Sequence, residues 1–198
     1  MKIEIEPKYE FIAGDEFYCP LKNCTYRRIR ASRNFGSVKK GQIGGYIGHG
    51  SSLSHAGNCW LADEAMISDQ VIIQDNAWVG GYADISHSCT IKDDAVVSGY
   101  ATLYGPSLTI CGRAIISGNC SINKDSWIGG TTHIEGFAEV VSARDLVEGY
   151  YDRHWISGTL EPSVNEINEM SRQFILCRAL ERGRVNPPQP LRYTLEPF

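Results

Sequence analysis

The sequence predicts an all-β fold, namely a parallel β-helix of hexapeptide repeats with about five to six triangular coils, an N-terminal cap and a C-terminal α-helix. The first observation is a grid of fifteen aliphatic residues spaced by six, with a single one-residue slip. The grid residues are Leu61, Ile67, Ile73, Val79, Ile85, Ile91, Val97, Leu103, Ile110, Ile116, Ile122, Ile128, Ile134, Val140 and Leu146. A period of six fits neither a helix nor a plain strand, so it indicates stacked coils.

Two further patterns support the hexad. Most grid residues have a small residue two positions earlier, such as Ala65 or Cys89, and both members of such a pair point into the core of a short strand. Turn-forming residues come two and three positions after the grid residue, for example Asp75-Asn76 and Gly99-Tyr100. Three hexads make one triangular coil of eighteen residues, and the slip near Gly105-Pro106 predicts a local bulge.

The pattern divides the chain into three parts. Residues 1–46 form the cap, residues 47–148 the solenoid, and residues 149–198 a linker, a helix and a proline-rich tail. A capping box at Ser163 and Glu166 precedes apolar residues at helical spacing, which predicts a helix over residues 163–182. The residues on the apolar face of this helix are Ile167, Met170, Phe174, Cys177 and Leu180. The tail is expected to be an extended arm on the solenoid, with a ligand for a proline-reading module as the alternative.

Composition sets the broad class of protein. The start of the chain resembles no signal peptide and the apolar runs are too short for a membrane span, so we expect a cytoplasmic protein with no membrane contact. Seven cysteines, an odd number, argue against a disulfide framework. Cys19 and Cys24 have the spacing of half a zinc site, but no second ligand pair follows, so no metal site is expected.

Charge is distributed unevenly along the chain. Residues 1–46 carry nine Lys/Arg against five Asp/Glu, a net +4, whereas residues 61–150 carry four against twelve, a net −8. Every charged residue between Arg27 and Lys40 is basic. No nucleic-acid-reading motif accompanies this basic span, so we expect a solvated cap surface and no direct nucleic-acid binding.

Two sequence blocks carry a resemblance to a known family. They read FG-VKKG-IGGYI over residues 35–47 and LS-GNCW over residues 53–60. With the hexads that follow, they resemble the YdcK-like β-solenoid family of bacterial and phage proteins, which are often labelled acetyltransferases or polymer-forming proteins. The resemblance covers roughly residues 25–148. It implies an N-terminal segment that caps one end of the solenoid, and similarity to hexapeptide proteins in general implies left-handed coils.

Outward residues indicate where the solenoid makes contacts. Sorting them by coil face gives one apolar column and an adjacent aromatic corner. The column is Trp60, Trp78, Val96, Ile115 and His133, and the corner is Tyr82, Tyr100 and Phe137. Such a column is costly to leave in water, so it predicts an interface with the C-terminal helix, with further copies in a dimer or trimer, or with both.

Two functions are compatible with these residues. The favoured one is a non-catalytic scaffold that binds a protein partner, for instance a phage or prophage accessory factor that inhibits a host defence protein. The acidic residues Asp69, Asp75, Asp93 and Asp94 would then attract a nucleic-acid-binding host protein by imitating a polyanion.

The alternative is a CoA-dependent acyltransferase with acetyl-CoA as its cofactor. Hexapeptide acyltransferases resembling this fold use a histidine as general base. His133, the outward-pointing last member of the column, is the candidate. The chain lacks a long insertion loop, a phosphate-binding loop and a nucleophile motif, so the sequence favours the scaffold.

Overall fold

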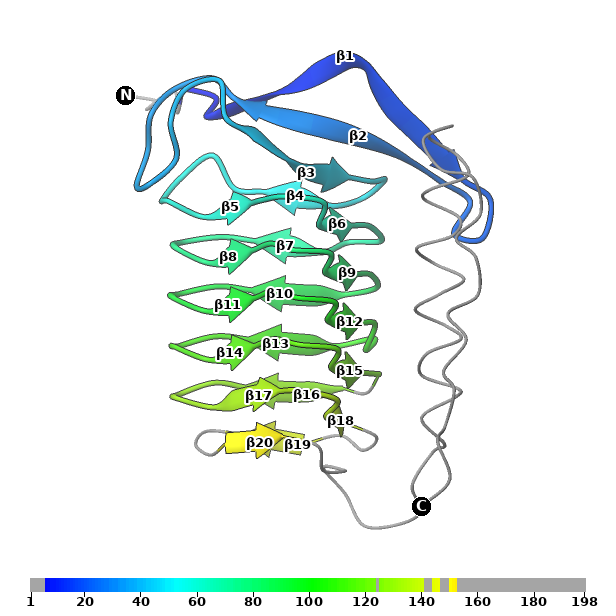
Figure 1. Cartoon of the computed structure of the whole chain (residues 1–198), viewed down its shortest axis with the longest axis vertical. Coiled ribbons are helices and arrows are strands. Elements are labelled where there is room, and N and C mark those ends of the chain that lie inside the picture. Colours follow the sequence, from blue (N-terminus) through cyan, green and yellow to red (C-terminus); the bar gives the residue numbers. More distant parts are fainter. Residues whose placement is uncertain (1–5, 124, 141–143, 147–149, 153–198) are drawn as a thin grey trace, which may run out of the picture. The chain divides into compact units, whose positions relative to one another are not determined.

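The computed structural model describes residues 6–123, 125–140, 144–146 and 150–152, and this part of the chain is all-β. Short parallel strands stack in three sheets along one axis (Figure 1). Each coil gives one strand to each sheet, and five full turns separate β3 from β18. The predicted β-solenoid is confirmed. The predicted helix at 163–182 and the tail lie outside the described residues.

From β3 onward, the strands alternate among the three sheets in chain order. The first sheet contains β1 (Tyr9–Cys19), β2 (Cys24–Ala31), β3 (Ile43–Ile47), β6 (Met66–Ile67), β9 (Asp84–Ile85), β12 (Thr102–Leu103), β15 (Ser121–Ile122) and β18 (Glu139–Val140). The second contains β4 (Ser52–Leu53), β7 (Ile72–Ile73), β10 (Cys89–Ile91), β13 (Leu108–Ile110), β16 (Ser126–Ile128) and β19 (Arg144–Leu146). The third contains β5 (Trp60–Leu61), β8 (Trp78–Val79), β11 (Val96–Val97), β14 (Ile115–Ile116), β17 (His133–Glu135) and β20 (Tyr150–Asp152).

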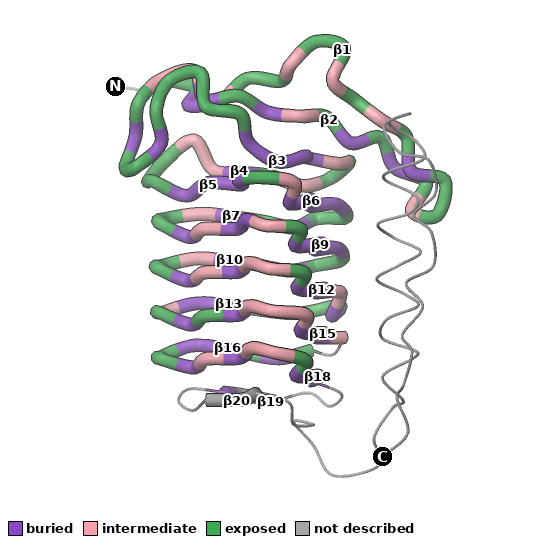
Figure 2. Tube along the Cα trace, in the orientation of Figure 1, coloured by how far each residue is buried: buried purple, intermediate pink, exposed green. Residues whose placement is uncertain are grey.

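The inward grid forms one continuous core. All fifteen aliphatic grid residues are buried, and together with the small residues that precede them they form the core of the coils. Figure 2 shows buried positions recurring from coil to coil. Backbone hydrogen bonds join each coil to the next, such as those from Trp78 N to Ala95 O (2.9 Å) and from Val96 N to Ala114 O (2.9 Å). The hexad register inferred from the sequence is therefore the register of the structure.

The corners explain the turn residues. Asp63, Asp75 and Asp93 take left-handed backbone angles, with φ of 54°, 59° and 59°, as do the glycines at equivalent corners. Gly81 also needs to be glycine for space, because a Cβ there would lie 2.7 Å from the carbonyl oxygen of Gly99 on the next coil. The slip in the grid falls at the corner between β12 and β13, so strand pairing continues on both sides of it.

A hairpin closes the N-terminal end of the solenoid. Strands β1 and β2 are antiparallel, β2 pairs antiparallel with β3, and β3 pairs parallel with β6 of the next coil. The boundary expected at residue 46 falls inside β3, which belongs to the cap and to the first coil at once. The sequence indicated a cap but not its two long antiparallel strands.

Candidate interaction surfaces

The predicted apolar column lies along the third sheet. Parallel pairing aligns each outward residue with the next, from Trp60 on β5 through Trp78, Val96 and Ile115 to His133 on β17. Because the strands are joined rung by rung, these side chains are held at a fixed spacing of roughly 4.8 Å from coil to coil. Ile115 is 38% exposed, and Trp78, Val96 and His133 are half-buried.

Trp60 does not belong to the exposed part of this column. Its side chain is fully buried under the cap, where the ring of Phe35 packs against it edge-on at 5.5 Å. A Cβ at Gly44 would lie 2.6 Å from Cζ2 of Trp60, so the glycine makes room for the indole. The expectation that Trp60 contacts a partner is therefore corrected, because the chain's own cap covers it. We call Trp78, Val96 and Ile115 the apolar stripe.

Trp78 and Trp127 each lie over the glycine that follows two residues later in the chain. A Cβ at Gly80 would come within 3.0 Å of Trp78 Nε1, and one at Gly129 within 2.4 Å of the Trp127 ring. Each indole thus lies close against the backbone of its own coil. The W-x-G pattern was a readable sequence signal for this arrangement and was missed. Trp127 is on the second sheet and is 39% exposed, so it provides a matched comparison for Trp78.

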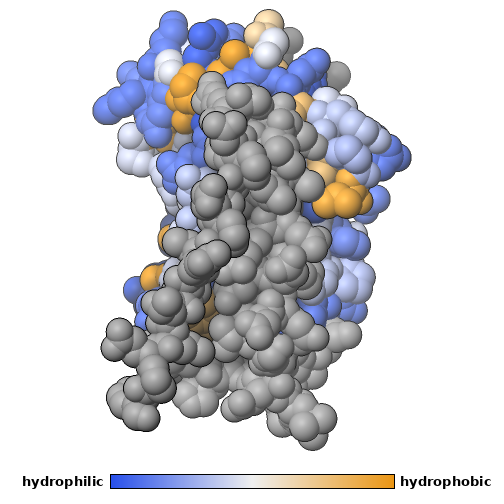
Figure 3. Space-filling view, turned by 45° about the vertical axis from the view of Figure 1, so that its right-hand side comes forward, coloured by the Kyte–Doolittle hydropathy of each residue, from blue (hydrophilic) through white to orange (hydrophobic). Residues whose placement is uncertain are grey.

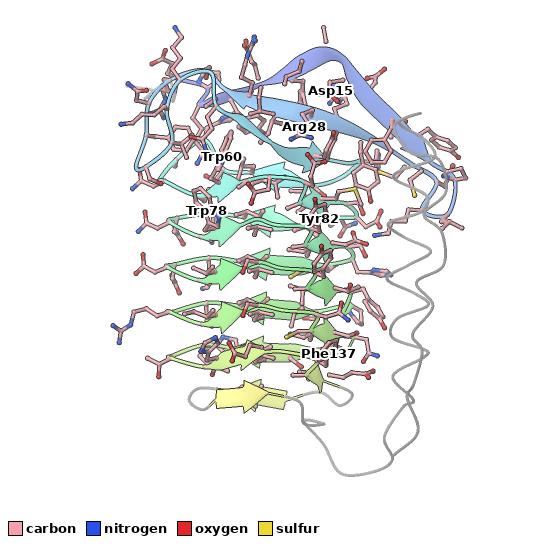
Figure 4. The ribbon with its side chains drawn as sticks, viewed as in Figure 1. Asp15, Arg28, Trp60, Trp78, Tyr82 and Phe137 are labelled. Atoms are coloured by element: carbon pink, nitrogen blue, oxygen red, sulfur yellow. The ribbon has the colours of Figure 1, made fainter. Side chains whose placement is uncertain are left out.

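The aromatic corner follows the third sheet. The rings of Tyr82 and Tyr100 stack at 5.0 Å with an interplanar angle of 4°, and both are exposed. Asn119 occupies the same corner one coil further on, and exposed Phe137 the coil after that. Figure 4 shows Tyr82 and Phe137 along one edge of the stack and Trp60 and Trp78 along another. The structure brings the predicted corner residues into one row, with Asn119 between two of them.

The four acidic residues do not form a single surface. Asp75, Asp93 and Asp94 lie at the corner between the second and third sheets, whereas Asp69 lies at the corner between the first and second. Asp75 accepts a hydrogen bond from Asp93 N (3.2 Å), and Asp93 accepts one from Gly112 N (2.9 Å). These two carboxylates therefore connect successive coils in addition to carrying charge.

An amide ladder runs beside these aspartates. Asn58 Nδ2 donates to Asn76 Oδ1 (3.1 Å), and Asn76 Nδ2 donates to Asp94 Oδ1 (3.0 Å). Asp69 accepts a hydrogen bond from Ser68 Oγ (3.3 Å). All four predicted acidic residues thus take part in local hydrogen bonding within the described chain.

His133 has a carboxylate neighbour. Its Nε2 lies 3.2 Å from Oε2 of Glu135, two residues further on the same strand, and both side chains are about one-third exposed. Alternate residues of a strand point to the same side, which explains the pairing. A carboxylate in this position can hold an imidazole ring in a fixed orientation.

The cap is anchored by side chains that the sequence did not single out. Lys8 is fully buried, and its Nζ contacts Cys59 Sγ (3.1 Å) and the carbonyl oxygen of Ala56 (3.3 Å). Burial lowers the pKa of Lys8. At the other end of the hairpin, Lys22 Nζ contacts both carboxylate oxygens of buried Asp84, at 2.6 and 2.7 Å.

The basic span is partly used inside the fold. Arg28 donates to Glu64 (2.7 Å) and to the Tyr46 hydroxyl (2.7 Å), and Arg30 forms an exposed ion pair with Glu10. On the face drawn in Figure 3, the coloured part of the cap surface is mostly hydrophilic, with small apolar areas. Arg28 and Arg30 are therefore paired with carboxylates, whereas Arg27, Lys39 and Lys40 are exposed on the cap surface.

Among the residues that the structure describes, no group of three or more metal-ligating side chains comes together, and no helix has the length and hydrophobicity to cross a membrane. No family model matches the chain, and no curated protein is significantly similar to it.

Proposed function

We propose that this chain is a non-catalytic β-solenoid scaffold that works by binding other proteins. The observation that carries the proposal is the apolar stripe, because it lies on a face whose backbone is fixed by parallel pairing on both sides. A preformed surface loses little conformational entropy when it binds. Fully burying an exposed side chain of this size is worth about 1.5 to 3 kcal/mol, and covering the part of each stripe residue that is still exposed gains a fraction of that value.

The stripe is the contact between copies of the chain, in a dimer or a trimer. A straight row of side chains along one face suits a closed symmetric assembly, in which every copy presents the same surface. The aromatic corner is then left for a different protein, since tyrosine is enriched among the residues that dominate binding energy.

The partner is a host protein, and the chain is a phage or prophage accessory factor that inhibits it. The resemblance to YdcK-like solenoids, which occur in bacteria and phages, supports this part of the proposal. Asp75, Asp93 and Asp94 concentrate negative charge at one corner, which favours a partner with a basic, nucleic-acid-binding surface.

The test uses two tryptophans in equivalent local settings. Trp78→Glu places a charge in the stripe on the third sheet, and Trp127→Glu places the same charge on the second sheet. Light scattering should give a lower mass for Trp78→Glu than for the wild type, with circular dichroism unchanged. Trp127→Glu should keep the wild-type mass. Equal masses for all three proteins, or a loss of mass in Trp127→Glu alone, would contradict the proposal.

One observation favours a second function, that of a CoA-dependent acyltransferase. The His133–Glu135 pair has the composition of a general base with an orienting carboxylate. Calorimetry with acetyl-CoA, followed by turnover assays of His133→Ala and Glu135→Gln, separates the two functions. Micromolar binding together with turnover that both substitutions reduce would establish the enzyme. Absence of binding supports the scaffold.

A further inference from the structure

Two cysteines face each other at the end of the cap hairpin. Strand β1 ends at Cys19 and β2 begins at Cys24, and the two residues are direct partners in the antiparallel register. The turn between them is well defined, since Asn23 has a φ of 46° and its N–H donates to the carbonyl oxygen of Pro20 (3.3 Å). The Tyr18 hydroxyl also donates to Asn23 Oδ1 (2.7 Å). The backbone thus holds the two cysteines in place.

The geometry of this pair suits a covalent link. Residues directly opposite in an antiparallel pair point to the same face, and their Cα atoms lie about 4.5 to 5.5 Å apart. A disulfide accepts Cα separations of roughly 4.4 to 6.8 Å. Cys19 and Cys24 are both free thiols, and both are buried, at 4% and 3% exposed.

Cys24 has a defined role in the reduced chain. Its Sγ accepts a hydrogen bond from His49 N (3.2 Å), and a Cβ at Gly48 would lie 2.6 Å from this sulfur. Burial raises the pKa of Cys24, with the hydrogen bond from His49 opposing the shift. Because the thiolate is the reactive form, the raised pKa slows oxidation of Cys24 at neutral pH, and the rate is expected to increase as pH rises.

We propose that Cys19 and Cys24 are an oxidation site that closes to an intramolecular disulfide when a hydroperoxide reaches the cap. Hydrogen peroxide first oxidises one thiol to a sulfenic acid and releases one water. The second thiol attacks that sulfur, an S–S bond forms, and a second water leaves. Two thiols lose two electrons in total, and one peroxide is reduced to two waters. The product is a six-residue ring, Cys19 to Cys24.

This ring contains the residue that joins the hairpin to the solenoid. Lys22 lies inside it and contacts Asp84 on β9. Closing the ring restricts the turn from which Lys22 projects, so oxidation is expected to stiffen the cap where it contacts the first sheet. Cys89 and Cys120 are buried on different coils; Cys89 pairs with Leu108, and Cys120 directly precedes β15. They are the internal controls.

The experiment uses the full chain under native conditions. Trypsin cleaves after Lys8, Lys22 and Arg27, so it places the two cysteines on separate peptides, residues 9–22 and 23–27. After peroxide treatment and alkylation of the remaining thiols, mass spectrometry should find these peptides linked, with the loss of about 2 Da expected for two hydrogens. A reductant should separate them. Hydrogen exchange within residues 19–24 should slow in the oxidised chain.

Two variants and an unfolded control make the result decisive. In Cys19→Ala and in Cys24→Ala the remaining thiol should accumulate a sulfenic acid that a dimedone-type reagent captures, with no linked pair. The chain unfolded in urea should show links among several cysteines, because the native register no longer selects one pair. Native chain that oxidises at other cysteines without linking the two peptides, or that links them no more often than the unfolded chain, would overturn the proposal.

Discussion

The cap and the coils are stabilised by different kinds of contact. In the coils, every hexad repeats an inward aliphatic side chain and backbone hydrogen bonds to the next coil. In the cap, specific side chains make single long-range contacts, such as Lys8 with Cys59 and Lys22 with Asp84. A repeated contact tolerates the loss of one copy, whereas a unique contact has no substitute. Stability in the cap is therefore expected to depend on a few polar groups, and stability in the coils on the core.

The largest expected effect distinguishes the two sides of one coil strand. Ile73 points inward and is fully buried, whereas its neighbour Ile72 points outward and is 41% exposed. Ile73→Asp buries a carboxylate among apolar side chains and should abolish soluble, β-rich protein. Ile72→Asp should melt within a few degrees of the wild type by circular dichroism. If both variants melt alike, the register of the coils is wrong.

A smaller effect is expected from the ion pairs of the cap. Lys22→Ala leaves the buried Asp84 carboxylate without its amine and should cost about 1 to 3 kcal/mol in the free energy of unfolding. Arg30→Ala removes an ion pair whose side chains are about half exposed, so the loss should stay below about 0.5 kcal/mol. Urea denaturation compares the two variants. Equal losses would mean that the hairpin end is not anchored through Lys22.

Acid should weaken the cap before it affects the coils. His55 stacks on Tyr9 at 4.6 Å, and its Nδ1 accepts a hydrogen bond from Lys8 N (3.2 Å). Burial lowers the pKa of His55, and the neighbouring charges of Lys8 and Arg33 lower it further.

The folded chain therefore favours neutral His55, and the unfolded chain binds its proton more readily. The stabilisation is present above the ordinary histidine pKa of about 6.5 and is lost as pH falls below it, towards the lower pKa of the folded state. Thermal melts between pH 7.5 and 5 should show a decline that is reduced in His55→Phe, which keeps an aromatic ring on Tyr9. An identical decline in both proteins would exclude His55 as its cause.

The coils could be read from the sequence because one steric requirement recurs in every hexad. Inward positions, left-handed corners and the alignment of the third-sheet column all follow from a period of six and a coil of eighteen residues. The same arithmetic would have placed Asp69 and Asp75 on different corners, because they lie one hexad apart. The prediction of one acidic surface rested on charge alone, whereas the hexad spacing already separates Asp69 from Asp75.

The cap could not be read in this way. A lysine is ordinarily exposed, and nothing local marks Lys8 for burial, because its partners lie near residues 56–59. Trp60 occupies an outward position of the repeat, yet it is buried because β2, β3 and the loop with Phe35 fold over it. Long-range contacts made only once leave no periodic trace in a sequence.

Hydrogen exchange measured residue by residue tests the difference between cap and coils most directly. Amides of β8, β11 and β14 should exchange slowly and together, whereas those of β1 and β2 should open at least about tenfold more often through local unfolding. Lys22→Ala should accelerate exchange in β1 and β2 and leave the coil strands unchanged. Acceleration of equal size in β11 and β14 would show that cap and coils unfold as one unit, which contradicts the separate anchoring described here.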